Sequence, residues 1–210
     1  MAPYRYFFRQ FAAATCAITL AVDYFRSPEV LELFSVWALA IHFVYFQLPG
    51  RSRAVAYSHA CSFVGAGVGV ALYCHLFMWK PTIETDRMEL WDVSFSTVVA
   101  RAALTHFAPV LFHALDVSFN QQHLIAAYQA KPRKLMYLWS FMSFGVLGLV
   151  YNVVFPQSEE TANIPGIDAR DFLYRSRVVT LVSTVVSFGL LWSLVLRRAY
   201  PPRKGRSRSQ

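Results

Sequence analysis

The chain consists of long, continuous apolar runs separated by short polar breaks. The runs lack the strict residue-by-residue alternation of membrane β-barrel strands. Most are close to the length of about 20 residues that a helix needs to cross a bilayer. They cover residues 10–25, 30–48, 54–79, 93–119, 135–155 and 178–196. The pattern therefore predicts an all-α membrane protein, a bundle of six transmembrane helices.

The end of the last apolar run divides the chain into two parts. Residues 1–196 form one membrane domain, and residues 197–210 form a basic, low-complexity tail that we expect to be disordered. The first apolar run has no small-residue cleavage site after it and resembles the later runs, so we interpret it as a retained span and not a signal peptide.

Composition agrees with a membrane protein, and the placement of charge suggests its orientation. Only 15% of residues are charged and 56% are hydrophobic, whereas soluble domains have about 25% charged residues. Lys and Arg gather in cytosolic segments of membrane proteins. With six spans and both termini in the cytosol, most Lys and Arg fall on the cytosolic side, and every acid except Asp116 falls on the other side.

The fourth run carries an unusual set of groups for membrane depth. Its ionisable residues are Arg101, His106, His113 and Asp116, and such groups within a span mark a functional-site hypothesis by default. Pro109 deprives the carbonyl of Thr105 of its helical partner, so we expect an irregular helix beside His106. His106, His113 and Asp116 share one helix face. That face either lines a cavity or forms interhelical hydrogen bonds.

The second run presents Ser35 and, seven residues later, His42 on one face. A serine acts as a nucleophile only with a base within hydrogen-bond reach. Counted from the starts of their runs, Ser35 lies about 10 Å shallower than His106, at a rise of about 1.5 Å per residue. The depth difference weakens this pair and leaves His42 as another partner for His106.

Three further features have structural interpretations. Gly65 and Gly69 stand in the GxxxG spacing of a helix-packing face. His59 and His75 flank the third run, where we expect them at the two membrane interfaces. His42, His106, His113 and Asp116 have side chains that suit zinc or iron, but no HxxxH-type pair is present, so we expect no metal site.

The layout of the spans resembles the androgen-induced membrane hydrolases, a family of small six-span proteins. LFSVWALAIHFVYF is similar to the family segment with the nucleophilic threonine, and Ser35 stands at that position. HFAPVLFHALD is similar to the segment that begins with the catalytic histidine, here His106, and reaches an acid ten residues later, here Asp116. The resemblance implies hydrolysis of fatty acid esters of hydroxy fatty acids.

The leading hypothesis is thus an intramembrane lipid ester hydrolase with Ser35 and His106 as the catalytic pair and no cofactor. Residues expected to line its site are His42, Arg101, Thr105, His113, Asp116 and Asn152. Arg101 and Asn152 are the candidates for the oxyanion donor that such a reaction needs. The substrate would be an acyl ester that enters from the bilayer.

Two other classes of function stay open. One is a non-catalytic structural or assembly subunit, and the other is a small transporter or proton relay along His42, His106, His113 and Asp116. The basic tail is expected to bind anionic lipid and not nucleic acid, and an oligomer or larger complex is left open. The expected location is the endoplasmic reticulum membrane, with the mitochondrial and plasma membranes as alternatives.

Overall fold

The computed structural model describes residues 3–26, 34–49, 52, 54–79, 82, 85, 88–89, 92–154 and 169–201. Its regular elements are helical, which confirms the all-α class. The main helices are α1 (Pro3–Arg26), α2 (Phe34–Gln47), α3 (Val55–Trp79), α5 (Phe95–Ala102), α6 (Ala108–Gln129), α7 (Arg133–Val154) and α8 (Ala169–Leu191). Two π turns, Ala103–Phe107 and Trp192–Leu196, join α5 to α6 and α8 to the short α9 (Arg197–Ala199).

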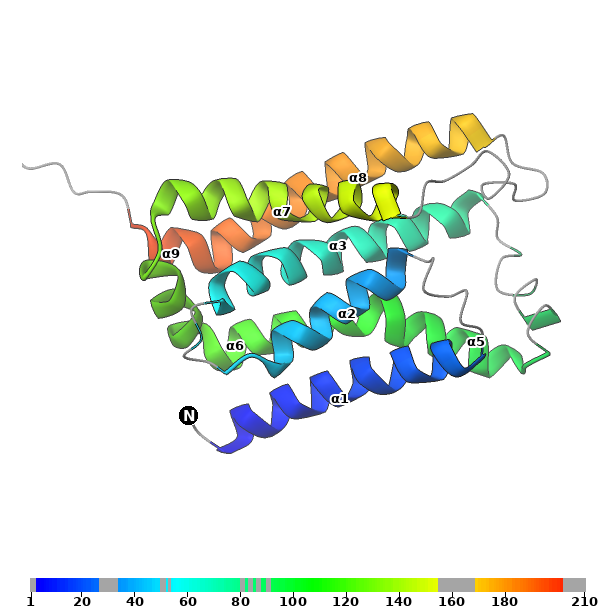
Figure 1. Ribbon diagram of the computed structural model, residues 1–210, viewed down its shortest axis with the longest axis horizontal. Helices are drawn as coiled ribbons and strands as arrows, with labels where there is room; N and C mark the ends of the chain where they lie inside the picture. Colours follow the sequence, from blue (N-terminus) through cyan, green and yellow to red (C-terminus); the bar gives the residue numbers. More distant parts are fainter. Residues whose placement is uncertain are drawn as a thin grey trace, which may run out of the picture.

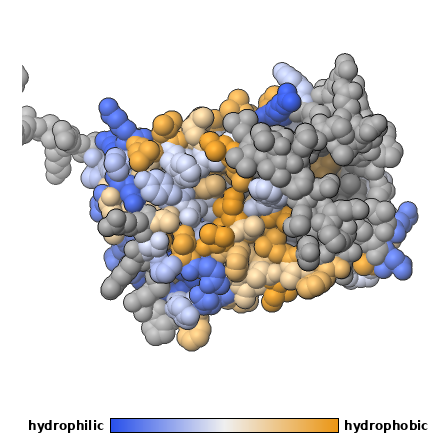
Figure 2. Space-filling view, in the orientation of Figure 1, coloured by the Kyte–Doolittle hydropathy of each residue, from blue (hydrophilic) through white to orange (hydrophobic). Residues whose placement is uncertain are grey.

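The helices lie roughly along one axis, and the beginning of α1 and α9 are at the same end of the bundle (Figure 1). Three helical segments are long and apolar enough to cross a membrane: Val55–Met78, Phe95–Gln129 and Tyr174–Ala199. Val36–Gln47 is a shorter apolar helix. Figure 2 shows hydrophobic residues over the middle of the molecule and hydrophilic residues toward its two ends, as expected for a bundle embedded in a bilayer.

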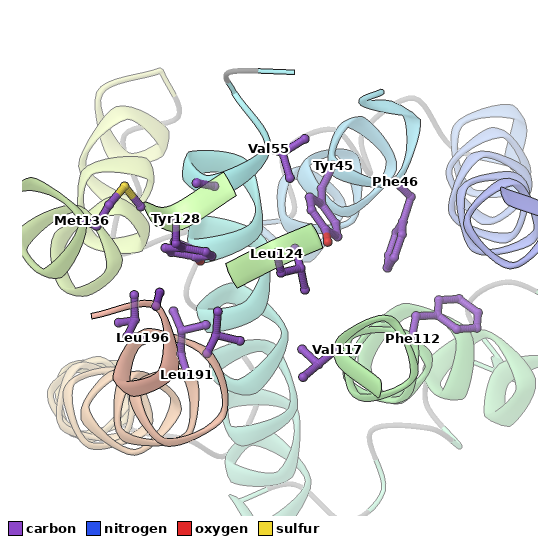
Figure 3. Close-up of a cluster of buried hydrophobic side chains, with 14 of the residues drawn as sticks. Tyr45, Phe46, Val55, Phe112, Val117, Leu124, Tyr128, Met136, Leu191 and Leu196 are labelled. Atoms are coloured by element: carbon purple, nitrogen blue, oxygen red, sulfur yellow. The ribbon is translucent and has the colours of Figure 1, made fainter. Parts of the chain in front are cut away.

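Helix α3 is at the centre of the bundle, in contact with α2, α6, α7 and α8. The close-up in Figure 3 shows the other helices arranged around it. Small residues allow this close approach. An added Cβ at Gly65 would lie 2.8 Å from the Phe144 ring, and one at Gly67 would lie 3.2 Å from Ser187 Cβ. Gly69 has nothing within 4 Å, so the packing positions are Gly65 and Gly67 and not the GxxxG pair.

The larger hydrophobic core lies toward the end of the bundle that holds α9. Tyr45, Leu124, Tyr128 and Met136 contribute to it from three helices (Figure 3). The helix expected to end at residue 196 continues through Ala199, which is also buried in this core. The remaining residues of the predicted tail, from 202 onward, lie outside the described residues.

Tyr200 fixes the end of the last helix against the α6–α7 turn. Its hydroxyl shares its one proton between the carbonyls of Tyr128 and Lys131, the latter at 3.0 Å. Burial raises the pKa of Tyr200 to about 12, and the nearby tyrosines Tyr137 and Tyr57 contribute to this shift. The hydroxyl therefore stays protonated at neutral pH and remains a donor.

The irregularity expected near Pro109 is present as the π turn at Ala103–Phe107. α6 begins directly after it, with proline in its first turn, a position where the missing N–H costs little. The wider π turn removes the conflict between the proline ring and a regular α-helical carbonyl. It also contains His106, so the residue singled out in the sequence lies in the irregular part of its span.

Replacing Gly67 with leucine should destabilise the bundle, because the new side chain would collide with α8 at Ser187. Overpacking of this kind costs about 1–3 kcal/mol. The matched control is Gly69→Leu on the same helix, where the space is open. Thermal unfolding of the purified protein in detergent would measure both; equal midpoints for the two variants would contradict the close packing described here.

Candidate functional site

Three neighbouring helices each direct two polar side chains into the bundle, three residues apart. The pairs are His42 and Tyr45 on α2, His59 and Ser62 on α3, and His113 and Asp116 on α6. Every one of these side chains is 2% exposed or less. Residues three apart lie on the same helix face, so the six groups form one buried polar cluster in an otherwise apolar interior.

At the centre of the cluster, the Ser62 hydroxyl lies between two imidazoles. Ser62 Oγ is 2.6 Å from His42 Nδ1 and 2.7 Å from His113 Nε2. The two ring nitrogens are themselves 3.4 Å apart. A hydroxyl has one proton to give, so Ser62 donates to one histidine and accepts from the other. This arrangement joins α2, α3 and α6 at one point.

The carboxyl group of Asp116 is bonded from two sides. The Tyr45 hydroxyl donates to Oδ2, and Asn120 Nδ2 donates to Oδ1 at 2.6 Å. The Tyr45 ring also stacks on His113, with 5.2 Å between the ring centroids. Hydrogen bonds to a carboxylate offset the loss of water around it. Asn120 therefore bonds Asp116 within α6, and Tyr45 joins Asp116 to α2.

Arg9 of α1 brings a positive charge to the same group. Its Nη2 donates to the Tyr45 carbonyl at 2.7 Å, and its guanidinium lies 4.9 Å from the centre of the Tyr45 ring. Arg9 is only 5% exposed. Tyr45 thus lies between a buried cation and a buried anion, and opposite charges in one region reduce the cost of burying each.

His59 lies near the beginning of α3, and its side chain points into the protein. It is fully buried, and its Nδ1 is 2.9 Å from the Tyr128 hydroxyl. His75, at the other end of α3, is also buried, at 5% exposure. His75 lines a pocket that also involves Tyr174, Arg175 and Val178 of α8.

Some buried polar atoms in this region have no hydrogen-bond partner among the described residues. They are His113 Nδ1, His59 Nε2, Asn120 Oδ1, Arg9 Nε and Thr105 Oγ1. Leaving such an atom unpaired costs about 1–3 kcal/mol, and buried water commonly supplies the missing bond. Thr105 is of particular interest because it precedes His106 in the π turn.

The contacts between α2 and α6 define how these two helices are aligned. His42 meets His113, and Tyr45 meets Asp116, so both pairs differ by 71 in residue number. Two contacts one helical turn apart with the same difference show that the two helices run in the same direction here, and Figure 1 shows this common direction. Ser35 and His106, seven residues before the His42–His113 contact, also differ by 71 in residue number.

The helix of the fourth run begins at Phe95, within two residues of the predicted start. His106 is half-buried, and its ring stacks on Tyr73 of α3 with 4.5 Å between centroids. Ser35 lies in the first turn of α2, but its side chain is outside the described part of the chain, as is that of Asn152.

The other predicted lining residues are distributed over two levels. His42, His113 and Asp116 belong to the buried polar cluster. Thr105 and His106 lie in the π turn, and Arg101 lies in α5 just before it. Among the residues that the structure describes, no group of three His, Cys, Asp or Glu side chains is placed to hold a metal ion.

The sequence interpretation missed Tyr45, His59, Ser62 and Arg9 as members of the cluster. A signal was available: each of the apolar runs two, three and four contains a histidine followed three residues later by another hydrogen-bonding residue. Arg9 had no such signal, because it stands at the edge of the first apolar run, where arginine usually marks a membrane boundary.

Comparisons of the chain with models of protein families, with curated proteins and with solved structures found no match.

Replacing Tyr45 with phenylalanine should lower stability, because it leaves one oxygen of the buried Asp116 carboxylate without its donor. The expected loss is about 1–3 kcal/mol. Tyr6→Phe is the matched control, since Tyr6 is 57% exposed. Thermal unfolding in detergent would compare them. If Tyr45→Phe unfolds at the same temperature as Tyr6→Phe, the Asp116 hydrogen bond contributes nothing to stability.

Proposed function

We propose that this protein is an intramembrane hydrolase of acyl esters, with Ser35 as nucleophile and His106 as general base. The observation that supports the pair is the constant difference of 71 residues between contacting positions of α2 and α6. It puts residues 35 and 106 seven residues before the His42–His113 contact on their respective helices. A hydroxyl and an imidazole at the same level of two adjacent helices are the minimum that this chemistry needs.

The reaction would proceed in two steps. The Ser35 hydroxyl attacks the ester carbonyl carbon while His106 takes its proton. The bond to the alcohol oxygen then breaks, and His106 returns the proton to the leaving alcohol. In the second step water attacks the acyl-serine with His106 again as base, which releases the fatty acid and restores Ser35. General-base assistance of this type contributes about 10²–10⁴-fold in rate.

The negative oxygen formed during each attack also needs a hydrogen-bond donor. Thr105 is a suitable donor because its buried hydroxyl has no partner within the described residues and it is next to His106. Arg101, one turn and a half earlier in the same span, is the charged alternative, and Asn152 of α7 is the third. The π turn supports a functional role here, since such turns are frequent at functional sites.

The substrate class follows from the membrane location and from the resemblance to the androgen-induced hydrolases. We infer fatty acid esters of hydroxy fatty acids or similar acyl esters, which would enter between helices from the bilayer. The chain would cross the endoplasmic reticulum membrane six times with both termini in the cytosol. The location of the α1 start and α9 at one end of the bundle agrees with an even number of crossings.

A non-catalytic structural role is the second candidate, and the buried polar cluster favours it. The Ser62 hydroxyl is fully buried between two imidazoles, so its bonds act between helices and reach no substrate. Polar contacts of this kind commonly hold membrane helices together. In that case the cluster would specify the arrangement of α2, α3 and α6, and no hydroxyl of the chain would react.

A fluorophosphonate probe, which labels activated serine hydroxyls covalently, distinguishes the two candidates in intact membranes. Wild-type protein should be labelled, and both Ser35→Ala and His106→Ala should lose labelling and the turnover of a fatty acid ester. Ser118→Ala and His123→Ala are matched controls, because both residues are exposed on α6, and they should behave as wild type. Ser35→Thr, which keeps a hydroxyl, should retain measurable turnover.

Absence of both labelling and ester turnover in the wild-type protein would overturn the hydrolase proposal and favour the structural role. Loss of labelling in Ser62→Ala, with labelling kept in Ser35→Ala, would overturn the assignment of the nucleophile. The thermal midpoint of each variant separates a lost reaction from a lost fold.

A further inference from the structure

An apolar groove runs along the face of the bundle formed by α1, α2, α3 and α7. Its volume is about 920 Å³, and the side chains along it include Leu20, Trp37, Ala40, Val44, Cys61 and Leu147. This size is within the range of about 300–1,000 Å³ that small-molecule sites occupy. At membrane depth, an open groove with such a lining is in contact with the acyl chains of lipids.

The groove is separate from the buried polar cluster. Ala40 and Val44 lie on a different face of α2 from His42 and Tyr45, as the helical period of 3.6 residues requires. A molecule in the groove would therefore contact the outer side of the α2–α3 pair. The inference drawn from this groove does not depend on hydrolase activity.

One end of the groove has a different chemical character. Tyr57 and Trp139 line it there, near the beginnings of α3 and α7. Trp139 Nε1 donates to the Tyr57 carbonyl at 2.9 Å, and the two rings meet edge to face at 5.7 Å. Trp and Tyr favour the level of lipid headgroups, so this end marks the membrane interface on the side of the bundle where α1 begins.

A positive charge stands directly beside this aromatic pair. Lys131 Nζ lies 5.0 Å from the centre of the Tyr57 ring. Lys131 belongs to the turn before α7, and Arg133 and Lys134 follow it at the start of that helix. The groove thus leads from an apolar middle, through an aromatic pair, to an ammonium group at the interface.

We propose that this groove is a binding site for an anionic glycerophospholipid. One acyl chain occupies the groove between α2 and α7, and the lipid phosphate binds the Lys131 ammonium beside Tyr57. The lipid runs from an apolar acyl chain to a charged phosphate, and the groove runs in the same order from its apolar middle, past the aromatic pair, to the Lys131 ammonium. A headgroup with net negative charge is attracted to the Lys131 ammonium more strongly than a zwitterionic headgroup of zero net charge, so this charge selects for an anionic lipid.

Tryptophan fluorescence can report the occupant directly, because Trp37 and Trp139 line the groove. A reporter protein carrying Trp79→Phe, Trp91→Phe and Trp192→Phe keeps only these two tryptophans. Lipids with brominated acyl chains quench tryptophan on contact. Brominated phosphatidylserine should quench the reporter with an apparent affinity about fivefold higher than brominated phosphatidylcholine, the effect of one lysine near an anionic surface.

Two substitutions test the two parts of the site. Lys131→Gln should abolish the preference for phosphatidylserine, whereas Lys134→Gln, which removes the same charge three residues later, should keep it. Ala40→Phe, which fills the groove, should reduce quenching by both lipids. A protein whose only tryptophan is introduced at Val185, 50% exposed on α8, reports the surrounding lipid and should show no preference.

Equal quenching of the reporter by the two lipids would overturn the proposal. An equal loss of the phosphatidylserine preference in Lys131→Gln and Lys134→Gln would also overturn it, because the preference would then come from the general basic charge of the protein. The same preference reported by the tryptophan at position 185 would overturn it as well. The far-ultraviolet circular dichroism of each variant establishes that it is folded.

Discussion

A charged carboxylate inside a membrane bundle is the constraint on which this structure depends. Asp116 is fully buried, and an unpaired charge at that depth would cost several kcal/mol. Its two oxygens are bonded to Tyr45 and Asn120, and Arg9 supplies the opposite charge on the other side of Tyr45. The bonds of Tyr45 to Asp116 and of Arg9 to Tyr45 join different helices, so they require α1, α2 and α6 to lie in one arrangement. The polar groups thus specify which helix faces meet.

Hydrophobic packing alone would specify the arrangement less sharply in a membrane, because lipid chains are as apolar as leucine. Close contact around α3 comes instead from small residues, Gly65 against Phe144 and Gly67 against Ser187. The Ser62 hydroxyl, placed between His42 and His113, adds a polar contact at the same central helix. Two glycines, Gly65 and Gly67, thus let neighbouring helices pack closely against α3, and the hydrogen bonds of Ser62 hold α3 to α2 and α6.

The sequence predicted the helices and the irregularity at Pro109, because both follow from local patterns: apolar length and a missing backbone donor. It also grouped His113 with Asp116 correctly on one face of α6. It did not predict that the His59 side chain is buried. A histidine near a helix end can contact either the membrane interface or a residue of another helix, and its partner Tyr128 is 69 residues away in the sequence. The sequence also did not predict which residues of α2 and α6 are in contact, because apolar runs do not show how one span is positioned along its neighbour.

The π turn at Ala103–Phe107 amounts to one extra residue inserted into an otherwise regular span. Each residue of an α-helix advances the chain by about 100° around its axis. If the same residues formed a regular α-helix instead, everything upstream, including Arg101, would lie about 100° further around the axis, on another side of the span. Excising a single amino acid from the turn would restore ordinary geometry and leave the upstream residues on their present side. The π turn thus sets the azimuth of the upper half.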